Sequence, residues 1–203
     1  MNSWDDTRIK KICCLGAGYV GGPTMAVIAD KCPHLEVTVL DINEERIIQW
    51  NNSDLDRLPV YEPGLKDVIQ RVRGRNLSFS TEIESVIAES QMVFISVNTP
   101  TKTKGFGAGY ASDLKWVESS ARKVAEFASG HTIVVEKSTI PVRTAQTIKS
   151  ILQAYEEKGG RIKQVALLNN RSYMLGSSLS PKHLSENQFW PFLFHLKAIK
   201  KSL

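Results

Sequence analysis

Residues 13–30 read CCLGAGYVGGPTMAVIAD, a glycine-rich turn between two apolar segments. Gly16, Gly18 and Gly21 lie between a strand-like run over residues 11–15 and a helix-like run over residues 19–31. The loop is either a cradle for a phosphate or an ordinary tight turn. As a cradle, its first glycine forms the turn, its second lets the backbone approach a pyrophosphate, and its third allows close helix–strand packing. The start of the helix adds unpaired N–H groups and partial positive charge.

An acidic residue lies where the phosphate interpretation requires one. Asp41 follows Gly21 at the end of a second predicted strand, over residues 36–40. A carboxylate there would bind the hydroxyls of an adenosine ribose, or else cap a helix. It favours NAD over NADP, because it repels a 2′-phosphate. Arg46 either lies over the adenine or belongs to a solvated helix face. FAD and S-adenosylmethionine use related loops, so these residues indicate an adenosine ligand, with NAD favoured.

Strand-like and helix-like segments alternate along the chain, which is typical of βαβ units and a parallel sheet. The strands are apolar throughout, as expected when helices cover both faces. The sequence therefore predicts an α/β fold with a doubly wound, mostly parallel sheet of the Rossmann type. The predicted strands cover residues 11–15, 36–40, 77–80, 92–97, 131–139 and 161–168. The predicted helices cover residues 19–31, 44–50, 65–74, 81–90, 113–129 and 141–157, with Asn43 as the N-cap of the second.

Two further segments follow predicted strands at the edge where ligands bind in such sheets. Small hydroxyl and amide side chains there suit a nicotinamide ribose, although plain turn chemistry explains them equally well. The first segment is Val97, Asn98, Thr99, Pro100 and Thr101. The second is Glu136, Lys137, Ser138 and Thr139.

Composition narrows the function classes. The net charge of +5 belongs to the end of the chain, because residues 161–203 carry seven Lys and Arg against one acidic residue. Residues 1–160 are nearly balanced, so no nucleic-acid-binding face is expected. The three cysteines and four histidines show no metal-site spacing, and few cysteines suit a reducing compartment. No apolar run is long enough to span a bilayer, and residues 1–11 do not resemble a signal peptide. We expect a cytoplasmic protein without a metal.

Four motifs in order carry a resemblance to a known family: GAGYVGGPT, YEPGL, FISVNTPT and EKSTIPVRTA. Together they resemble UDP-glucose 6-dehydrogenase, and its animal type even in KKICC and SDLKWVESSARKVA. The resemblance covers about residues 9–165. It implies a cytosolic oxidation of UDP-glucose to UDP-glucuronate with two NAD+, in the biosynthesis of nucleotide sugars and glycosaminoglycans. Thr139 would help to orient a water or hydroxyl near the reacting centre. The implied NAD-binding residues are Gly16, Ala17, Gly18, Tyr19, Val20, Gly21, Asp41, Arg46, Val97, Asn98, Thr99, Pro100, Thr101, Ser138, Thr139 and Ile140.

The resemblance stops near Val165, which divides the chain into a predicted NAD-binding domain (residues 1–165) and a tail (166–203). The family's acid/base glutamate, nucleophilic cysteine and main dimerisation helix have no counterpart in the tail. Because the second oxidation passes through a thiohemiacetal, we expect this chain to be catalytically incomplete. UDP-glucose and homo-oligomers would then belong to the complete family enzyme only.

The tail is expected to be irregular or partly helical, with membrane-surface binding as the minor alternative because Pro191 interrupts its apolar run. The sequence of a truncated or alternatively spliced product would look like this. The alternative functions are a non-catalytic NAD-binding or regulatory fragment and a complete small oxidoreductase that uses Thr139 and Lys137.

Overall fold

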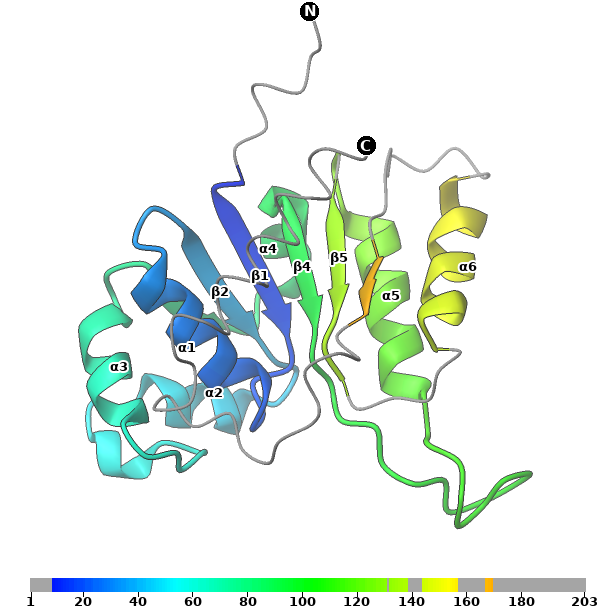
Figure 1. Cartoon of the computed structure of the whole chain (residues 1–203), viewed down its shortest axis with the longest axis horizontal. Helices are drawn as coiled ribbons and strands as arrows, with labels where there is room; N and C mark the ends of the chain where they lie inside the picture. Colours follow the sequence, from blue (N-terminus) through cyan, green and yellow to red (C-terminus); the bar gives the residue numbers. More distant parts are fainter. Residues whose placement is uncertain (1–8, 131, 139–143, 157–166, 170–203) are drawn as a thin grey trace, which may run out of the picture.

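The sheet confirms the predicted fold class. The computed structural model describes residues 9–130, 132–138, 144–156 and 167–169 (Figure 1). Within them, six parallel strands form one sheet in the order β3-β2-β1-β4-β5-β6. This is the doubly wound order in which the chain changes direction between β1 and β4. The strands are β1 Lys11–Leu15, β2 Glu36–Leu40, β3 Leu77–Ser80, β4 Met92–Ile95, β5 Ile133–Glu136 and β6 Leu167–Asn169.

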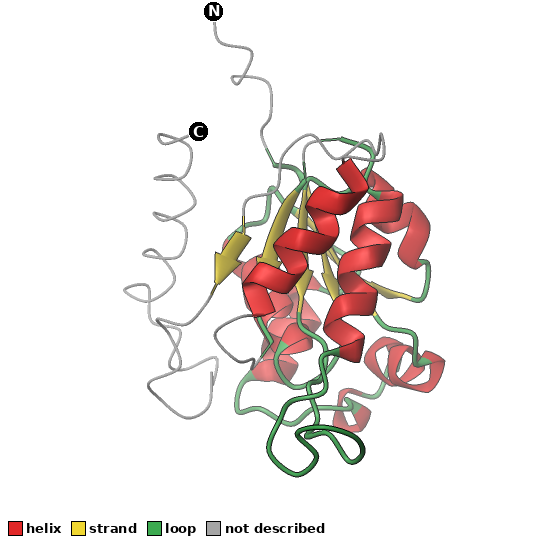
Figure 2. Ribbon diagram, turned by 90° about the vertical axis from the view of Figure 1, so that its right-hand side faces the viewer, coloured by secondary structure: helices red, strands yellow, loops and turns green. Residues whose placement is uncertain are grey.

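Helices cover both faces of the sheet (Figures 1 and 2). The first three helices contribute apolar side chains to one buried cluster and the last three to a second. Both faces of the central strands are therefore dry, which explains why their sequences are apolar throughout. The helices are α1 Gly21–Lys31, α2 Glu44–Asn51, α3 Leu65–Val72, α4 Ile83–Glu89, α5 Lys115–Phe127 and α6 Thr144–Glu156, with a 3₁₀ turn, η1, at Leu55–Arg57.

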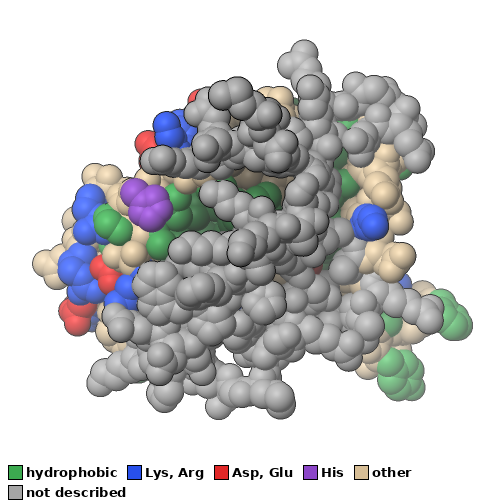
Figure 3. Space-filling model, turned by 45° about the horizontal axis from the view of Figure 1, so that its top comes forward, with side chains coloured by type: hydrophobic (Ala, Val, Ile, Leu, Met, Phe, Trp, Pro, Cys, Tyr) green, Lys and Arg blue, Asp and Glu red, His purple; other side chains and the backbone are tan. Residues whose placement is uncertain are grey.

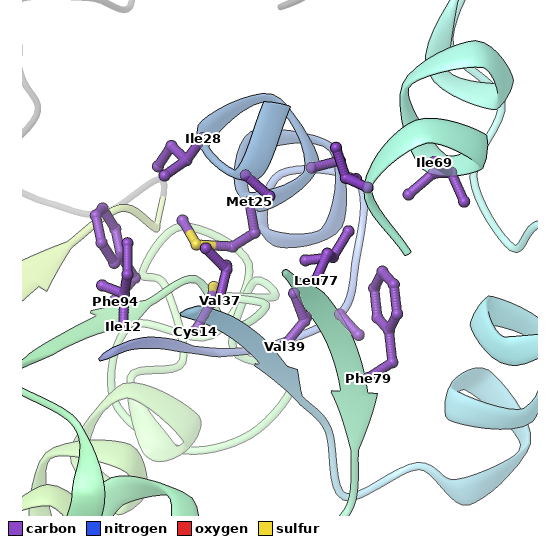
Figure 4. Packing of buried hydrophobic residues seen from close by; sticks show 14 of the residues in the cluster. Ile12, Cys14, Met25, Ile28, Val37, Val39, Ile69, Leu77, Phe79 and Phe94 are labelled. Carbon is purple, nitrogen blue, oxygen red and sulfur yellow. The ribbon is translucent and has the colours of Figure 1, made fainter. Parts of the chain in front are cut away.

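The adjacent cysteines show how the strands separate the two clusters. Successive side chains of a strand point to opposite faces. Cys14 accordingly packs in the cluster under α1, whereas Cys13 packs in the cluster under α5. Figure 4 shows the first cluster, in which Met25 and Ile28 of α1 lie over the strands. The adjacent cysteines therefore do not form a disulfide with each other.

Some element boundaries agree with the sequence prediction, and others differ by one or more residues. Strands β1, β2 and β3 begin and end at the predicted residues. The side chain of Asn43 accepts a hydrogen bond of 3.0 Å from the N–H of Arg46, so Asn43 caps α2 as predicted. Helix α1 begins at Gly21, two residues later than predicted, because residues 16–20 form the loop itself.

Strand β6 extends the sheet past residue 165. It pairs in parallel with β5. It begins inside the predicted strand over residues 161–168 and ends one residue after it, at Asn169. For residues 167–169, a strand replaces the irregular or helical conformation expected of the tail. The remaining residues of the tail, 170–203, lie outside the described residues. The domain boundary at residue 165 stays a prediction.

Three features of the described residues concern nucleic acid, membrane and metal binding: the surface charges, the helix lengths and the clusters of possible metal ligands. On the face visible in Figure 3, Lys and Arg side chains lie beside Asp and Glu side chains. None of the helices within the described ranges is both long and apolar enough to cross a membrane. The same residues hold no group of three His, Cys, Asp or Glu side chains that could bind a metal ion.

Candidate functional site

The three glycines of the loop at residues 16–21 have different surroundings. Gly16 has φ +107°, and a Cβ there would lie 2.4 Å from the carbonyl oxygen of Ser96. At Gly21 a Cβ would lie 1.9 Å from the carbonyl oxygen of Gly16. A Cβ at Gly18 would meet no atom within 4 Å. Gly16 and Gly21 are thus required by the turn and by its packing against strand and helix, while Gly18 lies open for the approach of a ligand.

The backbone N–H groups of this loop are free to bind an anion. The first hydrogen bond of α1 runs from the N–H of Gly22 to the carbonyl of Gly18. In the described part of the chain, the N–H groups of Gly18, Tyr19, Val20 and Gly21 have no acceptor. Val20 caps the helix without a side-chain hydrogen bond, and the first turn carries no acidic residue. Unpaired donors and the positive end of the helix dipole together favour a phosphate at this position.

Asp41 joins the glycine loop to α2. It follows β2 and is 9% exposed. One carboxylate oxygen, Oδ2, accepts the N–H of Ala17 at 2.9 Å and Nη1 of Arg46 at 3.1 Å. The other, Oδ1, accepts the N–H of Asn43 at 2.9 Å. The structure therefore brings three of the predicted residues, Ala17, Asp41 and Arg46, into one network, and it replaces the solvated-face interpretation of Arg46 with an ion pair.

Sequence reasoning missed a further residue of this network, Trp50 of α2. Its indole Nε1–H donates to the carbonyl of Ala17 at 2.8 Å. Its ring is fully buried and stacks on Phe79, with the ring centroids 4.7 Å apart and the planes 6° from parallel. A tryptophan on the apolar face of a predicted helix indicates a core residue. Its hydrogen bond to a loop more than thirty residues earlier has no signal in the sequence.

The second part of the candidate site lies at the carboxyl ends of β4 and β5. The backbone N–H of Lys137 donates to the carbonyl of Ile95 at 2.8 Å, and Ser138 Oγ donates to the same carbonyl at 3.4 Å. These bonds hold the residues after β5 against the last residue of β4. Val97 and Thr99 are half-buried, whereas Asn98, Pro100 and Thr101 are exposed. Predicted site residues Thr139 and Ile140 lie outside the described residues.

Two buried polar atoms in this part lack a hydrogen-bond partner in the described chain: Ser96 Oγ and Glu136 Oε1. Glu136 is 1% exposed, and burial raises the pKa of its carboxyl to about 7 against the opposing effects of the Ser138 N–H and the Lys137 charge. Burial also lowers the pKa of Lys137. We call residues 16–21, Asp41, Arg46 and Trp50 the adenosine half of the site. Its buried polar side chains all have hydrogen-bond partners, whereas the β4–β5 half contains two buried side-chain atoms without a partner among the described residues.

The cysteines offer no nucleophile at this edge. Cys13, Cys14 and Cys32 are all buried. Burial raises the pKa of Cys13 to about 12 and also raises the pKa values of Cys14 and Cys32. A thiol reacts as its thiolate, so all three are inert near neutral pH.

Comparison with known proteins places this site in a family. The profile described as "UDP-glucose/GDP-mannose dehydrogenase family, NAD binding domain" matches residues 10–181. The chain is 59% identical over 147 residues to UDP-glucose 6-dehydrogenase from Gallus gallus, covering 72% of this chain and 29% of the relative. It is 56% identical over 169 residues to UDP-glucose 6-dehydrogenase 2 from Oryza sativa, covering 83% of this chain and 34% of the relative. The chain thus spans about a third of the length of the curated relatives it matches.

Solved structures of dehydrogenases also resemble this chain. A UDP-glucose dehydrogenase from Pyrobaculum islandicum superposes with a TM-score of 0.64 at 27% identity, covering 80% of this chain and 36% of that chain. A GDP-mannose dehydrogenase from Pseudomonas aeruginosa superposes with a TM-score of 0.62 at 26% identity, covering 77% of this chain and 34% of that chain. The glycine loop, the acidic residue after β2 and these matches agree with one another. The chain therefore belongs to the UDP-glucose/GDP-mannose dehydrogenase family and contains its NAD-binding domain.

Proposed function

We propose that this chain binds NAD+ along the carboxyl edge of its sheet, as the cofactor-binding part of a UDP-glucose 6-dehydrogenase. The observation that carries the proposal is the row of unpaired N–H groups from Gly18 to Gly21, beside the carboxylate of Asp41. The donors suit a pyrophosphate, and the carboxylate suits the hydroxyls of the adenosine ribose. When bound, NAD+ supplies the hydride acceptor for oxidation of an alcohol.

Each half of the site has its own task in this proposal. The adenosine half holds the pyrophosphate and the ribose, with Arg46 beside the adenine. Asp41 disfavours NADP, because a 2′-phosphate would meet a carboxylate that is already buried. The β4–β5 half receives the nicotinamide ribose. Its proposed contacts are Val97, Asn98, Thr99, Pro100, Thr101, Ser138, Thr139 and Ile140.

We also propose that the chain by itself does not oxidise UDP-glucose. The second oxidation requires a thiolate that faces the nicotinamide. The three thiols of this sequence are buried in the sheet and α1 regions, and their pKa values are raised. Non-catalytic NAD binding is therefore the second candidate function, favoured by the share of about a third that the chain covers in its relatives. We further propose a cytoplasmic location, with neither nucleic acid nor membrane as a partner.

Thermal unfolding with and without NAD+ tests the proposal. A ligand that binds only the folded state stabilises it, by about 2.7 kcal/mol at a concentration one hundred times Kd. For a chain of this size, that corresponds to an increase in Tm of roughly 5–10 °C. We expect 1 mM NAD+ to raise Tm, NADP+ to raise it less, and UDP-glucose to yield no NADH absorbance. An unchanged Tm would contradict the binding proposal, and NADH formation would contradict the proposal of inactivity.

A further inference from the structure

The loop at residues 16–21 is held by side chains from two other elements, and both act on one residue. Ala17 is fully buried. Its N–H donates to Asp41 after β2 at 2.9 Å, and its carbonyl accepts the indole N–H of Trp50 in α2 at 2.8 Å. Both backbone polar groups of Ala17 are thereby fixed by side chains, 24 and 33 residues away in the chain.

The Trp50 hydrogen bond fixes the peptide group that contains the first unpaired N–H of the loop, that of Gly18. The carbonyl of Ala17 lies four residues before Gly21, so in a longer helix it would accept the N–H of Gly21. The indole donates to this carbonyl instead, and the first helical hydrogen bond joins the N–H of Gly22 to the carbonyl of Gly18. The N–H of Gly21 and those of the three preceding residues are left for a pyrophosphate.

The indole itself cannot move easily. It stacks on Phe79 of β3, and the backbone carbonyl of Trp50 accepts a hydrogen bond from Nη1 of Arg73 at 2.6 Å. Its other edge lies against α1, where a Cβ at Gly22 would be only 2.2 Å from the ring. The indole therefore packs between β3 and α1, and the backbone of Trp50 is bonded to the end of α3.

We propose that Trp50 is a positioning residue for NAD+: its indole N–H holds the Ala17 carbonyl so that the N–H groups of residues 18–21 face the pyrophosphate. Trp50 need not touch the cofactor, because it acts through the loop. The inference rests on the proposed function, since it concerns the same site.

The variant Trp50→Phe tests the hydrogen bond in the full chain. Phenylalanine retains an aromatic ring against Phe79 but has no N–H, so the Ala17 carbonyl loses its buried donor. We expect affinity for NAD+ and for ADP-ribose, which both contain the pyrophosphate, to fall about tenfold by calorimetry. The control is Phe79→Leu, which disturbs the same packing and retains the indole N–H. It should lower Tm comparably and leave the affinity within about twofold.

A measurement on the unaltered chain covers the case in which Trp50→Phe does not fold. In the ¹⁵N–¹H spectrum, the Trp50 indole resonance should exchange slowly with solvent and should shift on addition of NAD+ or ADP-ribose, but not of adenosine. Equal NAD+ affinity of the two variants, or an indole resonance that NAD+ leaves unchanged, would overturn the inference. Failure of the unaltered chain to bind NAD+ would instead overturn the proposed function, so the two failures are distinguishable.

Discussion

The two halves of the carboxyl edge differ in how completely their buried polar side chains are paired. In the adenosine half, the Asp41 carboxylate accepts three hydrogen bonds and the Trp50 indole donates one. In the β4–β5 half, Ser96 Oγ and Glu136 Oε1 are buried without a partner in the described chain. The hydrogen bonds of the first network all join residues 16–50, and Phe79 of β3 packs on its Trp50 ring. The adenosine half therefore forms its hydrogen bonds within the first βαβα unit, whereas the β4–β5 half leaves two buried side-chain atoms unpaired among the described residues.

The difference between the two halves has an energetic meaning. A buried polar atom without a partner costs about 1–3 kcal/mol, so native proteins pair most of them. Among the described residues, Ser96 Oγ and Glu136 Oε1 are two such atoms, near the ends of the neighbouring strands β4 and β5. The four predictions that follow test the comparison, from the largest expected effect to the smallest.

Gly21→Ala is expected to have the largest effect. The new Cβ would lie 1.9 Å from the carbonyl oxygen of Gly16, and both atoms belong to or adjoin rigid backbone. Because the loop cannot move away, we expect a loss of more than about 3 kcal/mol in the free energy of unfolding, measured by urea denaturation. The matched control is Gly18→Ala, where no atom lies within 4 Å. It should change stability by less than about 1 kcal/mol while weakening NAD+ binding, and equal destabilisation by both variants would contradict the assignment of the two glycines.

Asp41→Asn is expected to have the second-largest effect. Asparagine has one acceptor oxygen where aspartate has two, and its amide nitrogen would face either the N–H of Ala17 or that of Asn43. Leaving one buried donor unpaired should reduce stability by about 2–3 kcal/mol, measured by urea denaturation. The loss of negative charge should also narrow the difference in affinity between NAD+ and NADP+. If calorimetry shows an unchanged preference for NAD+, the carboxylate does not face the ribose.

Glu136→Gln is expected to stabilise the chain above neutral pH. The pKa of Glu136 is raised from 4.5 to about 7, so between these values the folded chain binds a proton that the unfolded chain releases. Its contribution to stability is complete below pH 4.5 and is lost as the pH rises through about 7. Glutamine does not ionise, so the variant avoids this loss. Its free energy of unfolding relative to that of the unaltered chain should increase by on the order of 2 kcal/mol from pH 5 to pH 8. The measurement is urea denaturation at both pH values.

The control for this variant is Glu89→Gln. Glu89 is exposed, and its hydrogen bond with Lys11 lowers its pKa. The substitution should therefore give no stabilisation at pH 8. A pH-independent effect of Glu136→Gln would show that its carboxylate is paired within the folded chain, and would remove the contrast between the two halves.

Arg46→Ala is expected to have the smallest effect on stability. Arg46 forms an ion pair with Asp41 at 3.1 Å, but its side chain is 42% exposed. Pairs screened by water contribute little, so the free energy of unfolding should change by less than about 0.5 kcal/mol. Calorimetry should show a weaker affinity for NAD+ if the guanidinium also lies beside the adenine. A loss above 1 kcal/mol in stability would mean that Arg46 is structural, like the rest of its network.

The residues themselves were sufficient to predict the fold, and they indicated where the adenosine half of the candidate site lies. The alternation of apolar strands and helices predicts the parallel sheet, because a strand covered on both faces must be apolar at every position. The glycine spacing and the place of Asp41 predict the adenosine half, because that half is built from local turns and one neighbouring strand. The predicted boundaries of β1, β2 and β3 agree with the structure for the same reason.

Tertiary structure alone decided the contacts between distant elements. Nothing in the order of residues indicates that the Trp50 indole holds the Ala17 carbonyl, or that Glu136 at the end of β5 is buried. Periodicity reports which face of an element is buried, but it carries no information about which distant polar atom a buried side chain meets. Those contacts depend on how α2 packs on β3 and how β5 aligns with β4. The energies of hydrogen bonding and burial therefore depend on the tertiary structure.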